Sequence, residues 1–100
     1  MADTNPDFLA HQGGDAVAVA VKDVEPGQAL VAFLDESAPV TIDVTAPIPL
    51  GHKVALRAVA LGDDVIEYGL RTAIASADIS KGDYVHTHNV RSARWHTSVA

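Results

Sequence analysis

Ile79-Ser-Lys-Gly82-Asp-Tyr-Val85-His86-Thr-His88-Asn89 joins the two sequence patterns that indicate how this chain folds and what it does. Its first half is the last of four copies of one short pattern, named here the glycine phrase: an apolar residue, two residues, glycine, two residues, and a second apolar residue. Its second half holds the densest group of possible ligands or proton carriers in the sequence. The earlier copies of the phrase are Val24–Leu30, Ile48–Val54 and Val59–Val65.

Each glycine phrase predicts a turn that leads into a strand. Glycine reaches positive φ without a Cβ clash, so it can occupy the position where the chain reverses, while the apolar residues anchor the two ends of the turn. The copies begin at residues 24, 48, 59 and 79, and this uneven spacing excludes the fixed period of a solenoid or propeller. We therefore expect one connector chemistry that is used repeatedly inside a single sheet-rich domain.

Short segments of β-branched or alternating residues lie between these turns and predict strands. In the first of them valines alternate with alanines, and the alanine face would allow another element to pack closely. Gly69-Leu70 is typical of a two-residue hairpin turn. Helical periodicity is not sustained anywhere, so we predict an all-β fold, with strands at Ala16–Val21, Ala29–Leu34, Val40–Thr45, His52–Arg57, Asp64–Tyr68, Arg71–Ser76 and Asp83–His88.

The composition indicates one acidic domain. A chain of 100 residues that is 48% hydrophobic supports one modest core, which we place at residues 8–90, between a flexible N-terminus (1–7) and a basic C-terminal tail (91–100). There is no cysteine, which excludes disulfides and thiolate metal sites. The net charge of −6 disfavours nucleic-acid binding. We expect a cytoplasmic protein that does not insert into membranes, because neither a spanning apolar run nor a signal peptide is recognisable.

His86 and His88 are candidate metal ligands. Residues two apart on a strand point to the same face, with Cα atoms about 6.5–7 Å apart, and two imidazoles at that distance can bind one metal ion. Two surface histidines on an exposed strand are the alternative. Asn89 offers an amide that could orient an imidazole or bind an acid.

Two further histidines lie next to or near glycines. His52 and Lys53 follow a turn, and a strand would send them to opposite faces; a lysine with a lowered pKa can act as a base, whereas a solvated lysine is the alternative. His11 and Asp15 are separated by a glycine-containing loop that could point both side chains one way, so that the aspartate orients the imidazole. An ordinary loop histidine is the alternative there.

Arg91 and Arg94, with Trp95 beside them, form the last candidate site. The planar guanidinium group suits carboxylate or sulfonate oxygens, and the indole could shield such a site. The alternative is a basic tail without a ligand.

These residues also carry a family resemblance. Four motifs occur in order: His11-x-x-x-Asp15, Pro-Leu-Gly51-His52-Lys53, Tyr68-Gly69, and Gly82-x-x-Val-His86-x-His88-Asn89. Together they resemble the SAF-type amino-terminal domain of the altronate and galactarate dehydratase family, over about residues 8–95. The resemblance implies a β-clip, a hairpin-rich sheet folded on itself. One departure is Ala16, where family members usually carry asparagine, and this weakens the first motif.

The resemblance also implies a function. In the dehydratases the domain is fused to a larger one, whereas here the chain is similar to members that form a separate small subunit, and its ending resembles the small subunits of sulfolactate sulfo-lyases. The implied reaction removes a proton beside a carboxylate and then expels a group from the next carbon, with sulfolactate giving pyruvate and sulfite. A divalent metal, iron by resemblance, would bind the small anionic hydroxy acid, and a large catalytic subunit would be the partner.

The implied roles follow motif positions. His86 and His88, with His11, would contribute to the metal site, His52 or Lys53 would transfer protons, and Asn89, Arg91 and Arg94 would bind substrate. The large subunit could instead supply the base. Two alternatives are the small subunit of a sugar-acid hydro-lyase and a non-catalytic module that docks onto the large subunit. A homo-oligomer of the chain is also permitted.

Overall fold

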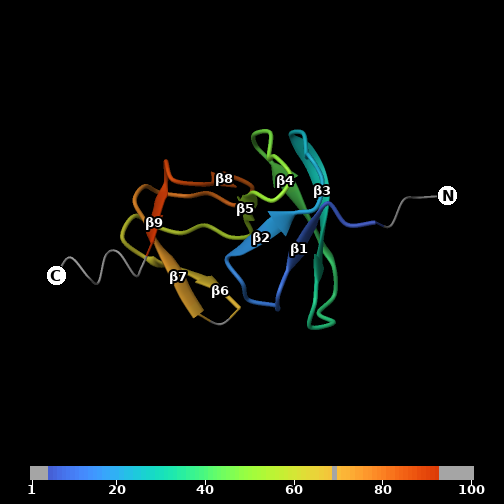
Figure 1. The fold of residues 1–100 in the computed structure, drawn as a ribbon, viewed down its shortest axis with the longest axis horizontal. Helices are drawn as coiled ribbons and strands as arrows, with labels where there is room; N and C mark the ends of the chain where they lie inside the picture. The colour runs from blue at the N-terminus through green and yellow to red at the C-terminus, as the bar shows by residue number, and fades with distance from the viewer. Residues whose placement is uncertain (1–4, 69, 93–100) are drawn as a thin grey trace.

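The computed structural model describes residues 5–68 and 70–92, and these form nine β-strands in two sheets (Figure 1). The predicted all-β fold is confirmed. Within the described residues no helix is long and apolar enough to cross a membrane. The strands are β1 (Phe8–Ala10), β2 (Val17–Ala20), β3 (Gly27–Phe33), β4 (Val40–Val44), β5 (Lys53–Ala55), β6 (Asp64–Glu67), β7 (Leu70–Ala75), β8 (Tyr84–Val85) and β9 (Val90–Ser92).

One sheet has six strands in the order β4-β3-β1-β2-β5-β8, and the other has three in the order β6-β7-β9. Neighbours run antiparallel except β1 and β3, which are parallel. Strands β1 and β9 were not predicted, because three residues are too few for an alternating pattern to be recognised. The two sheets lie side by side along the long axis of the molecule, with the six-stranded sheet nearer the N-terminus (Figure 1).

The four glycine phrases are joined in pairs at their first residues. Val24 and Ile48 exchange two backbone hydrogen bonds of 2.9 and 2.8 Å. Val59 and Ile79 exchange two more of 2.9 and 2.8 Å. The first phrase is thus bridged to the second and the third to the fourth, a long-range pairing that local sequence patterns do not predict.

An aspartate completes each bridge. The carboxylate of Asp23 accepts the backbone N–H of Leu50 over 2.9 Å, and that of Asp78 accepts the backbone N–H of Leu61 over 2.9 Å. The two bridges therefore use the same chemistry, and each positions the turn of one phrase against the start of another.

Three of the phrases form the same tight turn. Gly51, Gly62 and Gly82 have φ of 85°, 88° and 91°, as predicted for glycines at the reversal. Each donates its N–H over 2.8 Å to the carbonyl of an alanine in a neighbouring strand, and that alanine donates back to the carbonyl of the residue after the glycine. This reciprocal pair of bonds attaches each turn to a strand; the alanines, in the same order, are Ala20, Ala75 and Ala55.

Two hydrophobic clusters form the core, and strands β2 and β5 contribute to both. Alternation sends Ala18 and Val54 into the first cluster and Val17 and Ala55 into the second. The predicted close packing against the alanine face of β2 is confirmed. The first cluster consists of Phe8, Ala10, Ala18, Ala20, Val24, Ala29, Val31, Ile42, Val44, Ile48 and Val54, and the second of Ala16, Val17, Ala55, Val59, Val65, Ala75, Ile79 and Val85.

The two ends of the domain differ from the prediction. Asp7, placed in the flexible N-terminus, donates its N–H to the carbonyl of Leu30 over 2.9 Å and accepts the N–H of Leu30 on its carboxylate over 2.8 Å. At the other end Arg91 pairs with Ile74, so the first residue of the predicted tail belongs to strand β9. Both errors arise because the pattern of side chains in the sequence does not indicate which backbone groups are hydrogen-bonded to each other.

Two local predictions also need correction. The last predicted strand, Asp83–His88, pairs only at Tyr84–Val85, and residues 86–89 form a turn instead. The hairpin between β6 and β7 is confirmed, but Glu67 pairs with Leu70, so its turn lies one residue earlier than predicted. Tyr68 takes φ of 56° there, a value that favours glycine or asparagine and that side-chain pattern alone does not indicate.

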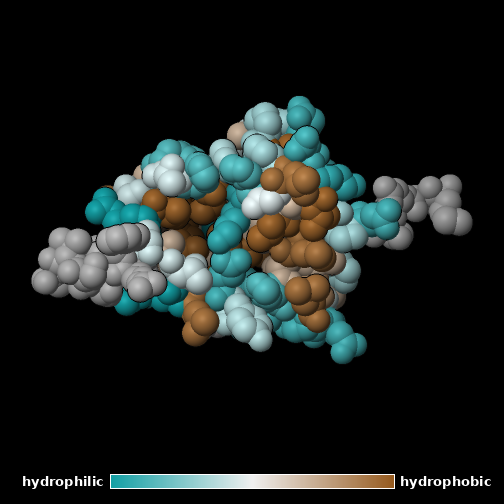
Figure 2. Space-filling view, viewed as in Figure 1, coloured by the Kyte–Doolittle hydropathy of each residue, from teal (hydrophilic) through white to brown (hydrophobic). Residues whose placement is uncertain are grey.

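The outward face of the six-stranded sheet is apolar where β1, β2 and β3 meet. Leu9 is paired with Val19 on one side and with Ala32 on the other, and all three are partly exposed. Figure 2 shows apolar residues gathered over these strands, with hydrophilic residues separating them from a second apolar area at the junction of the two sheets.

Gly82 should tolerate alanine much less well than Gly62. Both have positive φ, which costs an L-residue about 1–2 kcal/mol, but a Cβ on Gly82 would also overlap the carbonyl oxygen of Asp43, whereas a Cβ on Gly62 meets open space. We expect Gly82→Ala to lower the free energy of unfolding by at least about 1 kcal/mol more than Gly62→Ala, because overpacking adds to the strain. Urea unfolding of both variants measures this, and equal losses would contradict it.

Candidate functional site

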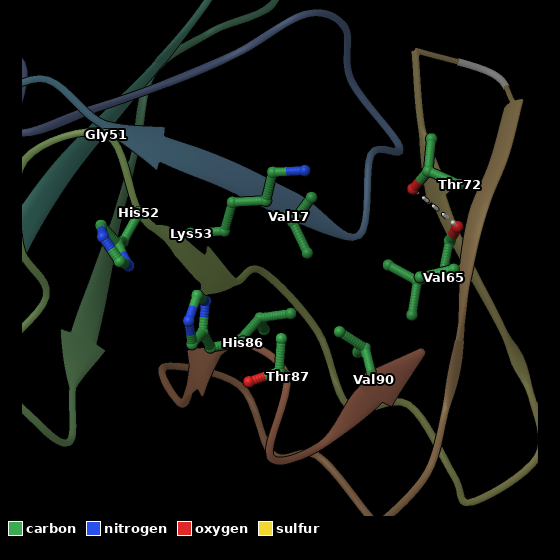
Figure 3. Close-up of a pocket in the computed structure, with 11 residues that line it drawn as sticks. Val17, Gly51, His52, Lys53, Val65, Thr72, His86, Thr87 and Val90 are labelled. Atoms are coloured by element: carbon green, nitrogen blue, oxygen red, sulfur yellow. Dashed lines mark hydrogen bonds between the residues drawn. The ribbon is translucent and has the colours of Figure 1, made fainter. Parts of the chain in front are cut away.

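A pocket of about 370 Å³ lies at the junction of the two sheets (Figure 3). Its walls come from strands β2, β5 and β8 of one sheet, strands β6, β7 and β9 of the other, and the turns after Gly51 and Val85. The lining is apolar on several sides and carries imidazole, ammonium and hydroxyl groups: Val17, Gly51, His52, Lys53, Val65, Thr72, Ala73, Val85, His86, Thr87 and Val90.

His52 is positioned by the turn of the second glycine phrase. Its N–H donates to the carbonyl of Pro49 over 2.9 Å, and its carbonyl accepts the N–H of Ala20 over 2.8 Å. Its Nδ1 lies 2.6 Å from the hydroxyl oxygen of Tyr84. The backbone and one ring nitrogen of His52 are therefore both held by the protein.

The rings of three histidines lie around the ring of Tyr84. Its ring stacks on that of His86 with centroids 5.4 Å apart and an angle of 7° between the planes. The ring of His88 is 5.7 Å from Tyr84, and the ring of His52 is 5.1 Å from that of His86. His86 and His88 thus share the neighbourhood of one aromatic ring, although they stand on a turn and not on the strand that was predicted to align them.

Asn89 shapes that turn. It is buried, its Oδ1 accepts the N–H of His86 over 2.9 Å, and its Nδ2 donates to the carbonyl of Tyr84 over 2.8 Å. Asn89 was predicted to bind substrate, but both ends of its amide are hydrogen-bonded to backbone here. The structure therefore favours a role in presenting His86, and the strand prediction failed because this side chain closes the turn.

Lys53 leaves the backbone in a different direction from His52. Its Nζ lies 2.9 Å from Oε1 of Glu67, whose side chain is 13% exposed. The predicted divergence of the two side chains is observed, and yet both line the same pocket. Because its amine is engaged in an ion pair, Lys53 is better suited to hold an anion than to accept a proton.

His11 and Asp15 do not form the predicted imidazole–carboxylate pair. The Asp15 carboxylate accepts the backbone N–H groups of His11, Gln12 and Tyr68 over 3.1, 3.3 and 2.8 Å. The His11 ring instead packs against the Tyr68 ring, with centroids 4.8 Å apart. Asp15 thus ties this loop to the β6–β7 hairpin through the backbone, which accounts for the first and third motifs occurring together.

A second carboxylate supports the same loop from outside. Asp35 accepts the N–H of Gly13 over 3.0 Å and that of Ser37 over 3.0 Å. The pKa of Asp35 lies below its ordinary value, first because the Ser37 hydroxyl donates to the carboxylate and then because these two backbone groups do.

Arg91, the first of the two predicted arginines, is not among the residues that line the pocket. Val90 lines it, and Arg91, as the next residue on β9, points to the opposite face of the strand. Arg94 and Trp95 lie outside the described residues, so their predicted role stays a prediction.

Tyr84, Glu67 and Thr72 were missed by sequence reasoning. Tyr84 is two residues before His86, and the alternation used for the histidines could have included it. Glu67 and Thr72 come from the other sheet, and only the three-dimensional packing places them near Lys53 or in the pocket wall.

The described residues do not assemble a metal site by themselves. Within residues 5–68 and 70–92, there is no group of three or more histidine, aspartate or glutamate side chains that could hold a metal ion. His11, the third predicted ligand, contacts Tyr68. The predicted role of His86, His88 and His11 in binding a metal therefore stays a prediction.

The resemblance carried by the four motifs implied a small β-clip, and comparison with known proteins defines the class. Residues 6–93 match the family model described as the altronate/galactarate dehydratase SAF domain, so the chain belongs to this family.

Its relatives include both separate subunits and parts of larger enzymes. It is 38% identical to the (2R)-sulfolactate sulfo-lyase subunit alpha of Chromohalobacter salexigens over 91 residues, which covers 89% of this chain and 97% of the relative. The subunit alpha from Paracoccus pantotrophus is 48% identical over 50 residues, covering 50% of this chain and 75% of the relative. The altronate dehydratase of Bacillus subtilis is 36% identical over 85 residues, but the match spans only 16% of that enzyme.

Asn89→Ala should destabilise the turn that presents His86. It removes one acceptor and one donor whose hydrogen bonds to the backbone are part-buried, and a bond of this kind contributes about 0.5–1.5 kcal/mol. We expect a lower free energy of unfolding in urea and altered amide signals at His86 and Tyr84. As a matched control, Asn89→Asp keeps the acceptor for the His86 N–H and should retain more stability than Asn89→Ala; the reverse order would contradict this role.

Proposed function

We propose that this chain is the small subunit of a lyase that acts on a small anionic hydroxy acid, with sulfolactate as the first candidate substrate and a separate large subunit as its partner. The observation that carries the proposal is the match along 97% of a sulfolactate sulfo-lyase subunit alpha. The pocket supports it, because His52 and Lys53 place polar hydrogens beside an apolar wall where a short organic acid would fit.

The reaction proposed for sulfolactate is an elimination. A base removes the proton from C2, the electron pair of that C–H bond forms the double bond to C3, and the C3–S bond breaks with its electron pair leaving on sulfite. The resulting enol takes a proton at C3 and loses the proton of its C2 hydroxyl, which gives pyruvate. As the C2 proton leaves, negative charge accumulates on the carboxylate oxygens, and cationic or N–H groups aimed at them stabilise the transition state.

The residues of this chain would mainly stabilise that negative charge. The Lys53 ammonium, steadied by Glu67, can bind a carboxylate or sulfonate, and His52 can hydrogen-bond to it or take part in proton transfer. Val17, Val65 and Val90 would exclude water from one side of the ligand. The base can come from His52 or from the large subunit.

A divalent metal, iron by resemblance, stays part of the proposal. His86 and His88 are the ligands that this chain would contribute, with the remaining ligands from the large subunit. When bound, the metal would polarise the substrate carboxylate and hydroxyl oxygens.

A sugar-acid hydro-lyase is the second candidate. It is favoured by the altronate dehydratase of Bacillus subtilis and by a second altronate dehydratase from Escherichia coli, 40% identical over 78 residues. The chemistry is the same except that water leaves in place of sulfite. A non-catalytic docking module is the third candidate, and the experiments below separate all three.

The substrate can be decided by reconstitution. The chain is to be co-purified with a candidate large subunit and supplied with sulfolactate or altronate. We expect sulfite and pyruvate from sulfolactate, and no turnover from the isolated chain, because its pocket is open and a 100-residue domain cannot enclose the substrate alone. Water loss from altronate without sulfite release would favour the second candidate, and activity of the chain alone would contradict the need for a partner.

The docking-module alternative predicts a different effect of substitutions in the pocket. We expect the double variant His52→Ala with Lys53→Ala to assemble with the large subunit but to lose about 100-fold or more in kcat/KM, since hydrogen-bond donors at developing charge contribute about that much. Lys81→Ala, which removes an exposed lysine elsewhere, is the matched control and should keep full turnover. Weakened assembly with an unchanged rate in the complex that does form would support docking alone.

A further inference from the structure

The contact between Tyr84 and His52 joins residues from two different glycine phrases. Tyr84 is held from three directions: β8 pairs it with Val54, its ring packs against the first hydrophobic cluster, and the His86 ring stacks on it. Its hydroxyl oxygen lies 2.6 Å from Nδ1 of His52, a short hydrogen bond between two side chains that the backbone already fixes.

Two arrangements of the hydrogen are conceivable in this bond. Either the phenol donates to a lone pair on Nδ1, or Nδ1 carries a hydrogen and donates to the phenol oxygen. The phenol is the more acidic donor, with a reference pKa of about 10, and the imidazole lone pair is much more basic than a phenol oxygen. The first arrangement therefore joins the better donor to the better acceptor.

We propose that Tyr84 is a positioning residue that holds neutral His52 with its hydrogen on Nε2, so that His52 offers the substrate a hydrogen-bond donor and no basic nitrogen. A neutral imidazole carries only one ring hydrogen, and when Nδ1 accepts from Tyr84 that hydrogen must be on Nε2. The inference deepens the proposed function and rests on it for the identity of the substrate, but the tautomer itself depends only on this chain.

The proposal assigns the ligand chemistry of this end of the pocket. A protonated Nε2 of His52 and the Lys53 ammonium are two donors in the lining of one pocket, and each suits an oxyanion, such as a carboxylate that gains charge as an enediolate forms. A protonated nitrogen can neither accept the C2 proton nor ligate a metal. The base of the elimination is consequently a group other than His52.

The tautomer can be measured on the full-length chain labelled with ¹⁵N. Long-range ¹H–¹⁵N correlations at about pH 8, where ordinary imidazoles are neutral, distinguish a protonated ring nitrogen from one with a lone pair. We expect His52 to show a protonated Nε2 and a hydrogen-bonded lone pair on Nδ1, with its signals assigned from the spectrum of His52→Gln. A protonated Nδ1 in the unaltered chain would overturn the proposal.

Tyr84→Phe tests whether the hydroxyl is responsible. This variant keeps the ring and its stacking on His86 but removes the donor, so the Nδ1 signal should move toward the value of a lone pair without a hydrogen bond. Tyr68→Phe, which removes the other tyrosine hydroxyl of the chain, is the matched control and should leave the His52 signals in place. Unchanged His52 signals in Tyr84→Phe would equally overturn the proposal.

Turnover of the assembled enzyme gives a second, independent measurement. Glutamine keeps an N–H donor but cannot act as a base near neutral pH, so His52→Gln should stay within about tenfold of the unaltered enzyme while His52→Ala falls about 100-fold. Equal losses in both variants would contradict the donor role. An unaltered enzyme that turns over neither sulfolactate nor altronate would count against the proposed function alone, because the tautomer measured in the isolated chain would still stand.

Discussion

The fold depends on the reciprocal pair of hydrogen bonds that attaches each tight glycine turn to an alanine of a neighbouring strand. The glycine N–H and the carbonyl of the following residue are used together, so neither the angle nor the register of the turn can slip. His52 follows one such turn immediately and Tyr84 lies two residues after another. Because both turns are fixed to strands, two side chains 32 positions apart meet at 2.6 Å.

The same backbone network explains why a pocket forms at the junction of the sheets. Strands β2 and β5 contribute small residues to two separate clusters, so the second sheet packs against their far side without completely filling the space between. The valine walls of the pocket result from this packing, and polar groups of the lining come from the turns at its edge. Its apolar and polar sides therefore have different structural origins.

Much of this arrangement was predictable from sequence, and the remainder follows from interactions that sequence patterns do not record. Glycine turns and valine alternation predicted an all-β fold, because both act locally through φ and side-chain direction. The ordered motifs predicted the family, which the match over residues 6–93 confirms. The turn at His86 was missed, since it depends on a side chain three residues ahead that returns to the backbone. The partner of Lys53 was missed for a related reason, because Glu67 belongs to the other sheet.

The pairing of the phrases has a consequence for how this scaffold can change over time. Each bridge joins a phrase whose turn is followed by polar side chains of the pocket, the second or the fourth, to a phrase that contributes no polar side chain to it, the first or the third. Hydrogen bonds between backbones maintain the bridges and are indifferent to the residues that follow Gly51 and Gly82. The residues at the pocket can therefore change while the backbone framework keeps its shape, which fits the similarity of this chain both to sulfolactate sulfo-lyase subunits alpha and to altronate dehydratases.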